Sequence, residues 1–193
     1  MTEGTKAQLI ALARRIGESG LTTSTGGNVS TRFPDGRLAI TPNKHHQTMA
    51  DLREDDLSII GPGGDLLEGP RPSVELPMHL AIYSAVPSTR WVVHAHPPLS
   101  IAYATEKLLP ETSVVEDSEM RMAFVGREEP GSEALALAVA GAVGKGSNCL
   151  FLEAHGVVVV AAEARSAYLL LEEVENACKA DLARKMLRLS KER

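Results

Sequence analysis

Two kinds of hydrophobic spacing alternate along the chain. Apolar residues recur every three or four positions over residues 5–18, 73–87, 130–146 and 163–189, and this spacing predicts four amphipathic helices. A shorter helix is expected over residues 97–108, because two prolines open that segment. Helices therefore lie at both ends of the chain and between its other predicted elements.

Serines and a proline are expected to mark the limits of two of these helices. Ser73 and Ser132 fit N-cap positions, because a serine hydroxyl accepts a hydrogen bond from a backbone N–H group of the first turn. Pro77 fits the first turn after Ser73, and Pro87 fits the end of the same helix.

Short apolar runs between the helices predict β-strands. The runs on either side of Pro34-Asp35-Gly36, within residues 28–41, predict a β-hairpin, and residues 57–69 repeat the pattern around a Gly/Pro turn. The other strands are expected at 90–96, as a pair over 148–162 broken near Gly156, and as one or two short strands within 113–126.

Together these elements predict a three-layer α/β/α domain. Helices bracket a group of short strands whose hairpins indicate a mostly antiparallel sheet, and a sheet buries both faces by packing helices against each. The sequence has no internal repeat and no low-complexity linker. We therefore expect residues 1–193 to form a single domain.

Composition narrows the possible functions. The chain has 193 residues, 44% of them hydrophobic and 23% charged, and its net charge is −5. No basic cluster offsets this charge, so nucleic acid and anionic membranes are not expected partners. No run approaches 18 apolar residues, and the N-terminus mixes acidic and basic groups, so we expect a cytoplasmic protein. Cys149 and Cys178 are too few for a disulfide framework, and both are expected to be reduced core residues.

Two histidines stand one residue apart at the end of a predicted strand, in RWVVHAHPP. Side chains at positions i and i+2 of a strand project from the same face, so His94 and His96 point into one space. Such a pair indicates a metal site, although two half-buried histidines bonded to backbone carbonyls are an equal alternative. A transition metal needs a third ligand and usually a fourth.

His155 is the strongest candidate for a third ligand. It lies at a strand break beside a glycine, where a side chain can leave the core and face a cleft, although it could also be a turn histidine. His79 follows Glu75 by four residues, but a packed helix histidine is the preferred interpretation. His45 and His46 are adjacent in a polar loop and are expected to be solvated.

Glu75 is expected at the start of a helix, where unpaired backbone N–H groups stabilise an anion. Helix capping explains a carboxylate there on local grounds. Three histidines on zinc, however, leave one coordination position open, and a nearby carboxylate can occupy it at rest and act as a base when substrate displaces it.

A glycine-rich loop, TSTGGNVSTR, supplies another candidate binding element. Gly26 and Gly27 permit unusual backbone torsions and close approach to a ligand, and Asn28 and Ser30 offer hydrogen-bonding groups. Taken alone, a plain turn is the preferred interpretation of this loop, because glycine pairs are common in loops.

Five short motifs occur in one order: GGNVS, ITP, PSVE before a helix, VVHAHPP, and LEAHG before a strand. In this order the chain resembles the class II aldolase/adducin family, typified by L-fuculose-1-phosphate aldolase, over residues 5–185. The resemblance implies an α/β/α fold and a homotetramer with active sites at subunit interfaces. It also implies zinc, or manganese, cobalt, nickel or iron, held by His94, His96 and His155, with Glu75 as the catalytic carboxylate.

The resemblance is incomplete at the phosphate pocket. The family's aldolases use the asparagine of GNVS, a Thr-Gly after ITP and two serines before the glutamate. Asn28 and Ser73 match, whereas Asn43-Lys44 replaces the Thr-Gly and Val74 replaces a serine. Lys44 could bind a phosphate or a carboxylate as a point charge. The substrate-binding candidates are Gly27, Asn28, Asn43, Lys44 and Ser73.

The family's tyrosine proton donor also lacks a counterpart, because the chain has only three tyrosines and no aromatic residue in VVEDSEM. Charged side chains of that segment could replace it, but a solvated charged strand edge is the preferred interpretation: Glu116, Asp117, Glu119 and Arg121. The acid that would complete the reaction is unassigned.

The resemblance implies a lyase that cleaves or forms a C–C bond in a small hydroxyketone or sugar phosphate through a metal-stabilised enediolate, with Glu75 moving the proton. Aspartate replaces the glutamate in related epimerases, which counts against epimerisation. The alternatives are a decarboxylase of a keto-acid or a sugar-phosphate dehydratase on the same metal site, and a non-enzymatic, adducin-like interaction domain.

Overall fold

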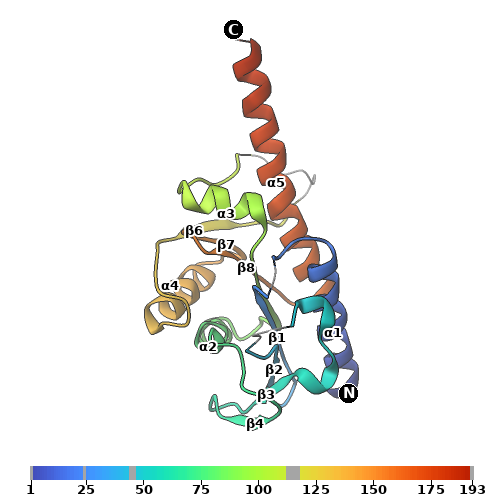
Figure 1. The fold of residues 1–193 in the computed structure, drawn as a ribbon. Helices are drawn as coiled ribbons and strands as arrows, with labels where there is room; N and C mark the ends of the chain where they lie inside the picture. The colour runs from blue at the N-terminus through green and yellow to red at the C-terminus, as the bar shows by residue number, and fades with distance from the viewer. Residues whose placement is uncertain (1, 24, 44–46, 112–117, 192–193) are drawn as a thin grey trace.

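The computed structural model describes residues 2–23, 25–43, 47–111 and 118–191, in which five α-helices surround one eight-stranded sheet (Figure 1). The helices are α1 (Thr2–Glu18), α2 (Leu76–Ala85), α3 (Pro98–Thr105), α4 (Glu133–Gly144) and α5 (Ala164–Lys191), with two short 3-10 turns, η1 (Met49–Asp51) and η2 (Glu54–Asp56). The strands are β1 (Asn28–Arg32), β2 (Leu38–Ile40), β3 (Ser58–Ile60), β4 (Leu66–Glu68), β5 (Trp91–Ala95), β6 (Met122–Val125), β7 (Cys149–Leu152) and β8 (Gly156–Ala161).

The sheet confirms the expected mostly antiparallel arrangement. Its strand order is β4-β3-β2-β1-β5-β8-β7-β6, and within it only β6 and β7 run parallel. The two predicted hairpins are β1–β2 and β3–β4, and the predicted strand pair is β7–β8. Because β5 lies between β1 and β8, the loop before β1 and the turn before β8 both reach the end of β5.

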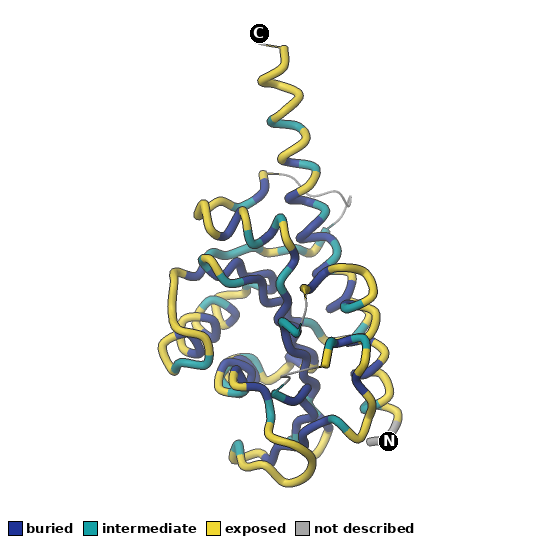
Figure 2. The backbone as a smooth tube through the Cα atoms, viewed as in Figure 1, coloured by how far each residue is buried: buried dark blue, intermediate teal, exposed yellow. Residues whose placement is uncertain are grey.

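Helices cover both faces of the sheet, as the three-layer prediction requires. Side chains of α1, α3 and α5 share one hydrophobic cluster with Trp91, Val93 and Ala95 of β5. Side chains of α2 and α4 share a second cluster with Val92. Successive strand residues point to opposite faces, so His94 of β5 faces the layer of α2 and α4. The strands at the centre of the molecule are the most buried part of the chain (Figure 2).

One helix boundary was predicted correctly and another was wrong. Ser132 caps α4, where its hydroxyl accepts a hydrogen bond from the Leu135 N–H at 3.1 Å. Ser73 is not the N-cap of α2, because the helix begins at Leu76 and Glu75 occupies the N-cap position. The backbone N–H of Ser73 donates instead to the Thr41 carbonyl, which holds Ser73 in an extended segment before the helix.

The segment predicted to hold one or two strands provides β6 within its described part, and residues 112–117 lie outside the described residues. Cys149 and Cys178 are buried and form no disulfide, as expected. The end of α5 extends beyond the rest of the molecule with its side chains exposed (Figures 1 and 2). Among the described helices, none is both long and apolar enough to cross a bilayer.

Candidate metal and carboxylate site

Three histidines from different elements meet at the end of β5. His94 is fully buried in β5, with Asn28 and Val158 as its neighbours across the adjoining strands. His96 lies just after β5, and His155 lies in the turn between β7 and β8. One ligand atom from each of the three lies within 4.8 Å of the others, so the group could hold a metal ion.

The hydrogen bonding of His94 fits metal ligation. Its Nδ1 lies 3.0 Å from the Val157 carbonyl oxygen, which can only accept, so Nδ1 carries the proton. The Nε2 lone pair therefore points into the site, where it lies 2.9 Å from Nε2 of His96. Two nitrogens at about 2.0 Å from a tetrahedral zinc ion are roughly 3.3 Å apart, so a small movement of the rings would admit the ion. A backbone partner on the second nitrogen is the usual way to orient a ligating histidine.

Glycines make room for the histidine rings. A Cβ atom on Gly26 would lie 2.4 Å from His96 Nδ1, and a Cβ atom on Gly156 would lie 2.7 Å from His96 Cδ2. Gly27 has a φ of +74°, and a Cβ there would lie 2.6 Å from the His94 carbonyl oxygen. In both glycine-containing motifs, the missing side chain therefore leaves space that the His96 ring or the backbone of His94 and Ala95 occupies.

Glu75 brings a buried carboxylate against the histidines. Its Oε2 lies 3.3 Å from His94 Nε2 and accepts a hydrogen bond from Asn28 Nδ2 at 2.7 Å. Its Oε1 lies 3.5 Å from His155 Nε2 and has no hydrogen-bond partner among the described residues. The side chain makes no capping hydrogen bond to α2, so capping does not account for it. A carboxylate in this position can exchange a proton with a molecule bound at the histidines.

Segments predicted to bind an anion run side by side. The Thr41 N–H donates to the Val29 carbonyl oxygen, and the Thr41 carbonyl oxygen accepts from the Ser73 N–H. The Asn43 N–H donates to the Arg71 carbonyl oxygen at 2.9 Å. This pairing places the GNVS, ITP and PSVE motifs together. The Ser73 hydroxyl accepts a hydrogen bond from the Glu75 N–H at 3.3 Å.

Other predicted residues lie outside this arrangement or outside the described residues. Val74 is 53% exposed, and a Cβ atom on Gly131, in the loop before α4, would lie 2.8 Å from the Val74 carbonyl oxygen. His79 is fully buried and is not part of the histidine group, which agrees with a packed helix histidine. The residues that lie outside the described part of the chain are Lys44, His45, His46, Glu116 and Asp117.

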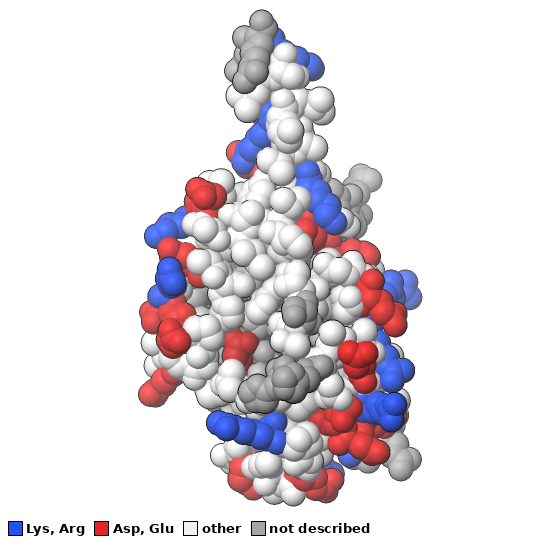
Figure 3. Space-filling model, viewed as in Figure 1, with Lys and Arg blue, Asp and Glu red and all other residues white. Residues whose placement is uncertain are grey.

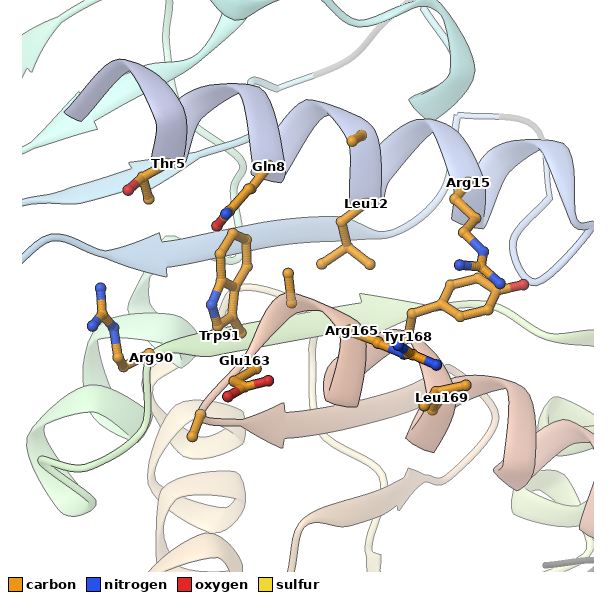
Figure 4. Close-up of a pocket in the computed structure, with 13 residues that line it drawn as sticks. Thr5, Gln8, Leu12, Arg15, Arg90, Trp91, Glu163, Arg165, Tyr168 and Leu169 are labelled. Carbon is orange, nitrogen blue, oxygen red and sulfur yellow. The ribbon is translucent and has the colours of Figure 1, made fainter. Parts of the chain in front are cut away.

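A cavity lies away from the histidines. It has a volume of about 700 Å³ and lies between α1 and the start of α5, with Trp91 of β5 and the preceding residue, Arg90, in its wall (Figure 4). Each strand residue advances about 3.3 Å, so Arg90 and His94 are roughly 13 Å apart along the strand. Trp91 and His94 also face opposite sides of the sheet. This cavity is therefore separate from the candidate site.

Charged side chains are spread over the molecular surface. On the face shown in Figure 3, acidic and basic side chains are intermixed along the edges, and the described residues on that face show no extended basic patch.

Comparisons with known proteins find related sequences and structures. The family model for the Class II Aldolase and Adducin N-terminal domain matches residues 7–182. Methylthioribulose-1-phosphate dehydratase from Methylococcus capsulatus is 35% identical over 120 residues, which are 62% of this chain and 57% of the dehydratase. The chain thus matches little more than half of that relative's length. The 3-oxo-tetronate 4-phosphate decarboxylase from Haemophilus influenzae is 30% identical over 181 residues, covering 90% of this chain and 85% of the decarboxylase. A solved L-fuculose 1-phosphate aldolase superposes with a TM-score of 0.81 and 27% identity, covering 94% of this chain and 86% of that one.

Proposed function

The chain belongs to the class II aldolase and adducin family, and from this premise we propose that it is a divalent-metal-dependent lyase. Its reaction cleaves or forms a C–C bond in a small phosphorylated hydroxyketone or keto-acid. The observation that carries this proposal is the buried carboxylate of Glu75, which lies 3.3 Å from His94 Nε2 with one oxygen lacking a hydrogen bond among the described residues.

His94, His96 and His155 are the proposed metal ligands, and zinc is the proposed ion because zinc commonly combines three protein ligands with one open position. Manganese, cobalt, nickel and iron are the alternative ions, because three imidazole ligands alone do not select among them. A bound divalent ion would supply positive charge that stabilises an enediolate next to a carbonyl group.

Glu75 is the proposed catalytic residue. Breaking a C–C bond beside a carbonyl leaves negative charge on carbon, and completing the reaction requires a proton there; the reverse reaction removes that proton. The carboxylate is held by Asn28 through Oε2, so Oε1 is the atom we assign to proton transfer. Burial beneath α2 restricts water around this atom, which favours proton exchange with substrate.

The proposed substrate-binding residues are Gly27, Asn28, Asn43, Lys44 and Ser73. Their motifs run side by side next to Glu75, and the backbone pairing of Thr41 with Ser73 supports this grouping. The relatives named above include a decarboxylase and a dehydratase of phosphorylated substrates, which supports a phosphate on the substrate. Lys44 would then bind it by charge.

Dehydration of a ketose phosphate is the second candidate reaction. It is favoured by the 35% identity to the dehydratase, although that match covers only 120 residues. C–C cleavage is preferred because the decarboxylase relative matches 90% of this chain.

The test uses metal-stripped protein reloaded with zinc, manganese or cobalt. It is offered a ketose 1-phosphate, assayed for release of dihydroxyacetone phosphate, and a 3-oxo acid 4-phosphate, assayed for carbon dioxide. We expect metal-dependent cleavage of one of the two. Loss of water from the ketose phosphate without C–C cleavage would replace the proposal with the dehydratase, and inactivity towards both with one metal ion bound per chain would contradict a lyase of this class.

We also propose that residues 1–193 act as one domain within a homotetramer. Several apolar side chains near the end of α5 are exposed and would suit contact with another subunit: Leu182, Met186, Leu187 and Leu189. Light scattering should give the mass of four chains, and Met186→Ser with Leu187→Ser should reduce it. A monomer at all concentrations would contradict this proposal.

A further inference from the structure

Five polar side chains form one continuous buried row between α2 and β1. Glu75 accepts from Asn28 Nδ2 at 2.7 Å, and Asn28 Oδ1 lies 2.5 Å from His79 Nε2. His79 Nδ1 lies 2.6 Å from the Ser30 hydroxyl, which lies 2.9 Å from the Tyr83 hydroxyl. All five side chains are at most 6% exposed. Glu75 is the end of the row at the candidate site, and Tyr83 is the end farthest from it.

Matching backbone repeats make this row possible. Glu75, His79 and Tyr83 are four residues apart, so they lie on one face of α2 at a rise of about 6 Å per step. Asn28 and Ser30 are two residues apart in β1, so they share one face at a rise of about 6.7 Å. Helix and strand side chains can therefore alternate along the row without stretching any hydrogen bond.

An ionised Glu75 fixes the direction of donation along the row, because at the other end the Tyr83 hydroxyl can donate either to Ser30 or to the Arg90 carbonyl oxygen, 3.3 Å away. The carboxylate of Glu75 accepts from the Asn28 NH2 group, so the Asn28 carbonyl oxygen faces His79 and must also accept. Burial lowers the pKa of His79 to about 3, with Glu75 opposing and His94 adding to this effect, so the ring is neutral and carries one N–H. That proton is on Nε2. Nδ1 consequently accepts from Ser30, and the Ser30 oxygen accepts from Tyr83.

We propose that His79 is a positioning residue that fixes the amide of Asn28 with its NH2 group towards Glu75. The proposal rests on the proposed role of Glu75. If the Asn28 amide rotated by 180°, its carbonyl oxygen would face the carboxylate and two acceptors would oppose each other. The Nε2–H group of His79 prevents this rotation because it requires an acceptor. Glu75 Oε2 is thereby held in place, and Oε1 is kept towards His155, where the proton is transferred.

The proposal changes the role of Asn28. Its carbonyl oxygen is engaged by His79 and one amide proton by Glu75. At most one N–H then remains for a substrate anion, so Asn28 acts on the carboxylate as well as on substrate.

The first test measures the tautomer of His79, and it does not depend on turnover. Long-range ¹H–¹⁵N NMR of the metal-loaded, histidine-labelled protein at pH 7 should show the Nε2–H form, with His79→Gln used to assign the signal. In Ser30→Ala the Nδ1 resonance should move, because its donor is lost, while Nε2 stays protonated. An Nδ1–H tautomer in the wild-type protein would overturn the proposed direction of the row.

The second test compares two replacements of His79. A glutamine can still donate to the Asn28 oxygen, whereas leucine cannot. We expect His79→Leu to lower kcat by roughly 10²-fold with KM and metal content unchanged, because a catalytic group displaced by about 1 Å loses activity on that scale. His79→Gln should recover most of the loss. Equal losses in the two variants would show that His79 only fills space.

These outcomes remain separable from failure of the lyase proposal. If His79→Leu does not fold, the wild-type tautomer and the His79→Gln kinetics still decide. If no lyase substrate is found, the tautomer measurement still supports or overturns the row.

Discussion

Glu75 and Glu175 are both buried carboxylates next to the start of a helix, yet their surroundings differ. Both oxygens of Glu175 are satisfied at the start of α3, where they accept from the Leu99 N–H, the Ser100 N–H and the Ser100 hydroxyl at 3.2, 2.9 and 2.8 Å. Glu75 accepts a single hydrogen bond, through Oε2, from the described residues. Buried polar groups in proteins are normally hydrogen-bonded, so the lack of a hydrogen-bond partner for Glu75 Oε1 among the described residues sets this carboxylate apart from Glu175.

Asp181, in the same region as Glu175, extends the contrast. It accepts from the Tyr103 hydroxyl at 2.9 Å and contacts Lys185 at 2.7 Å and Arg184 at 2.5 Å. Burial alone would raise the pKa of Asp181, but the hydrogen bonds from Lys185, Arg184 and Tyr103 hold it at about 2. The carboxylates of Glu175 and Asp181 therefore join α3 and α5, whereas the Glu75 carboxylate lies against His94 and His155 with one oxygen that no described residue hydrogen-bonds.

The sharpest contrast should come from glutamine replacement of the two glutamates. Glu75→Gln should lower turnover by about 10²- to 10⁴-fold without loss of stability, because it removes the proposed proton-transfer group. Glu175→Gln should leave turnover nearly unchanged and reduce the free energy of unfolding by about 1–3 kcal/mol, because a charged acceptor is lost. Steady-state kinetics and urea unfolding measure the two effects in both variants. A loss of turnover in Glu175→Gln together with a loss of stability in Glu75→Gln would contradict the comparison.

Replacing a glycine beside the histidines should weaken metal binding, whereas replacing a glycine elsewhere should not. In Gly26→Ala the new Cβ would press on the His96 ring, so metal affinity should fall by about 10- to 100-fold, as for other changes that misorient a ligand. Gly141→Ala in α4 is the matched control, because no atom lies within 4 Å of its Cβ position. Calorimetric titration with zinc measures both. Equal affinities would mean that the close approach of Gly26 to His96 is unimportant.

Asp181→Asn should affect stability alone. The variant loses charge-assisted hydrogen bonds at a buried site, so its free energy of unfolding should fall by about 2 kcal/mol. Turnover and metal content should match the wild-type protein. A drop in turnover of the folded variant would show that the α3–α5 contact also supports the site.

The two regions should lose stability in different pH windows. His79 has a pKa of about 3 when folded against 6.5 when unfolded, so the unfolded chain binds a proton first as pH falls below 6.5. Its contribution should decline from pH 6.5 towards pH 3, by up to about 1.4 kcal/mol per pH unit. Asp181 has a pKa of about 2 against 3.8, so its contribution is complete above 3.8 and is lost only as pH falls towards 2.

Unfolding measurements between pH 7 and 4 can isolate the first window. His79→Gln should show a shallower decline of stability than the wild-type protein, whereas Asp181→Asn should keep the same slope over this range. Identical slopes for His79→Gln and the wild-type protein would mean that the buried ring is not neutral as described.

The elements of the fold were largely predictable because each has a local signal. Helical periodicity, the hairpin turn at Pro34-Asp35-Gly36 and the break at Gly156 correspond to observed helices, turns and strand ends. The start of α2 was not predictable from Ser73, because the pairing of residues 41–43 with 71–73 depends on segments distant in sequence. Tertiary contacts outweigh a capping preference worth about 1 kcal/mol.

The candidate site was predictable in its parts but not in its connections. The motifs predicted that four side chains lie close together, and the structure brings them together: His94, His96, His155 and Glu75. The row through His79 was missed, although its signal was present: polar residues every four positions in a helix and every two in a strand. The sequence does not state that this helix face meets this strand, so their alternation became visible only in the structure.

The most direct test of the central claim, that Glu75 exchanges a proton with carbon at this site, is solvent deuterium exchange. Zinc-loaded protein in deuterated water is mixed with dihydroxyacetone phosphate, and proton NMR follows the hydroxymethyl protons at C3. We predict stereospecific loss of one proton in the wild-type protein and in Glu175→Gln, and none in Glu75→Gln with equal metal content. Exchange at the wild-type rate in Glu75→Gln would contradict the account.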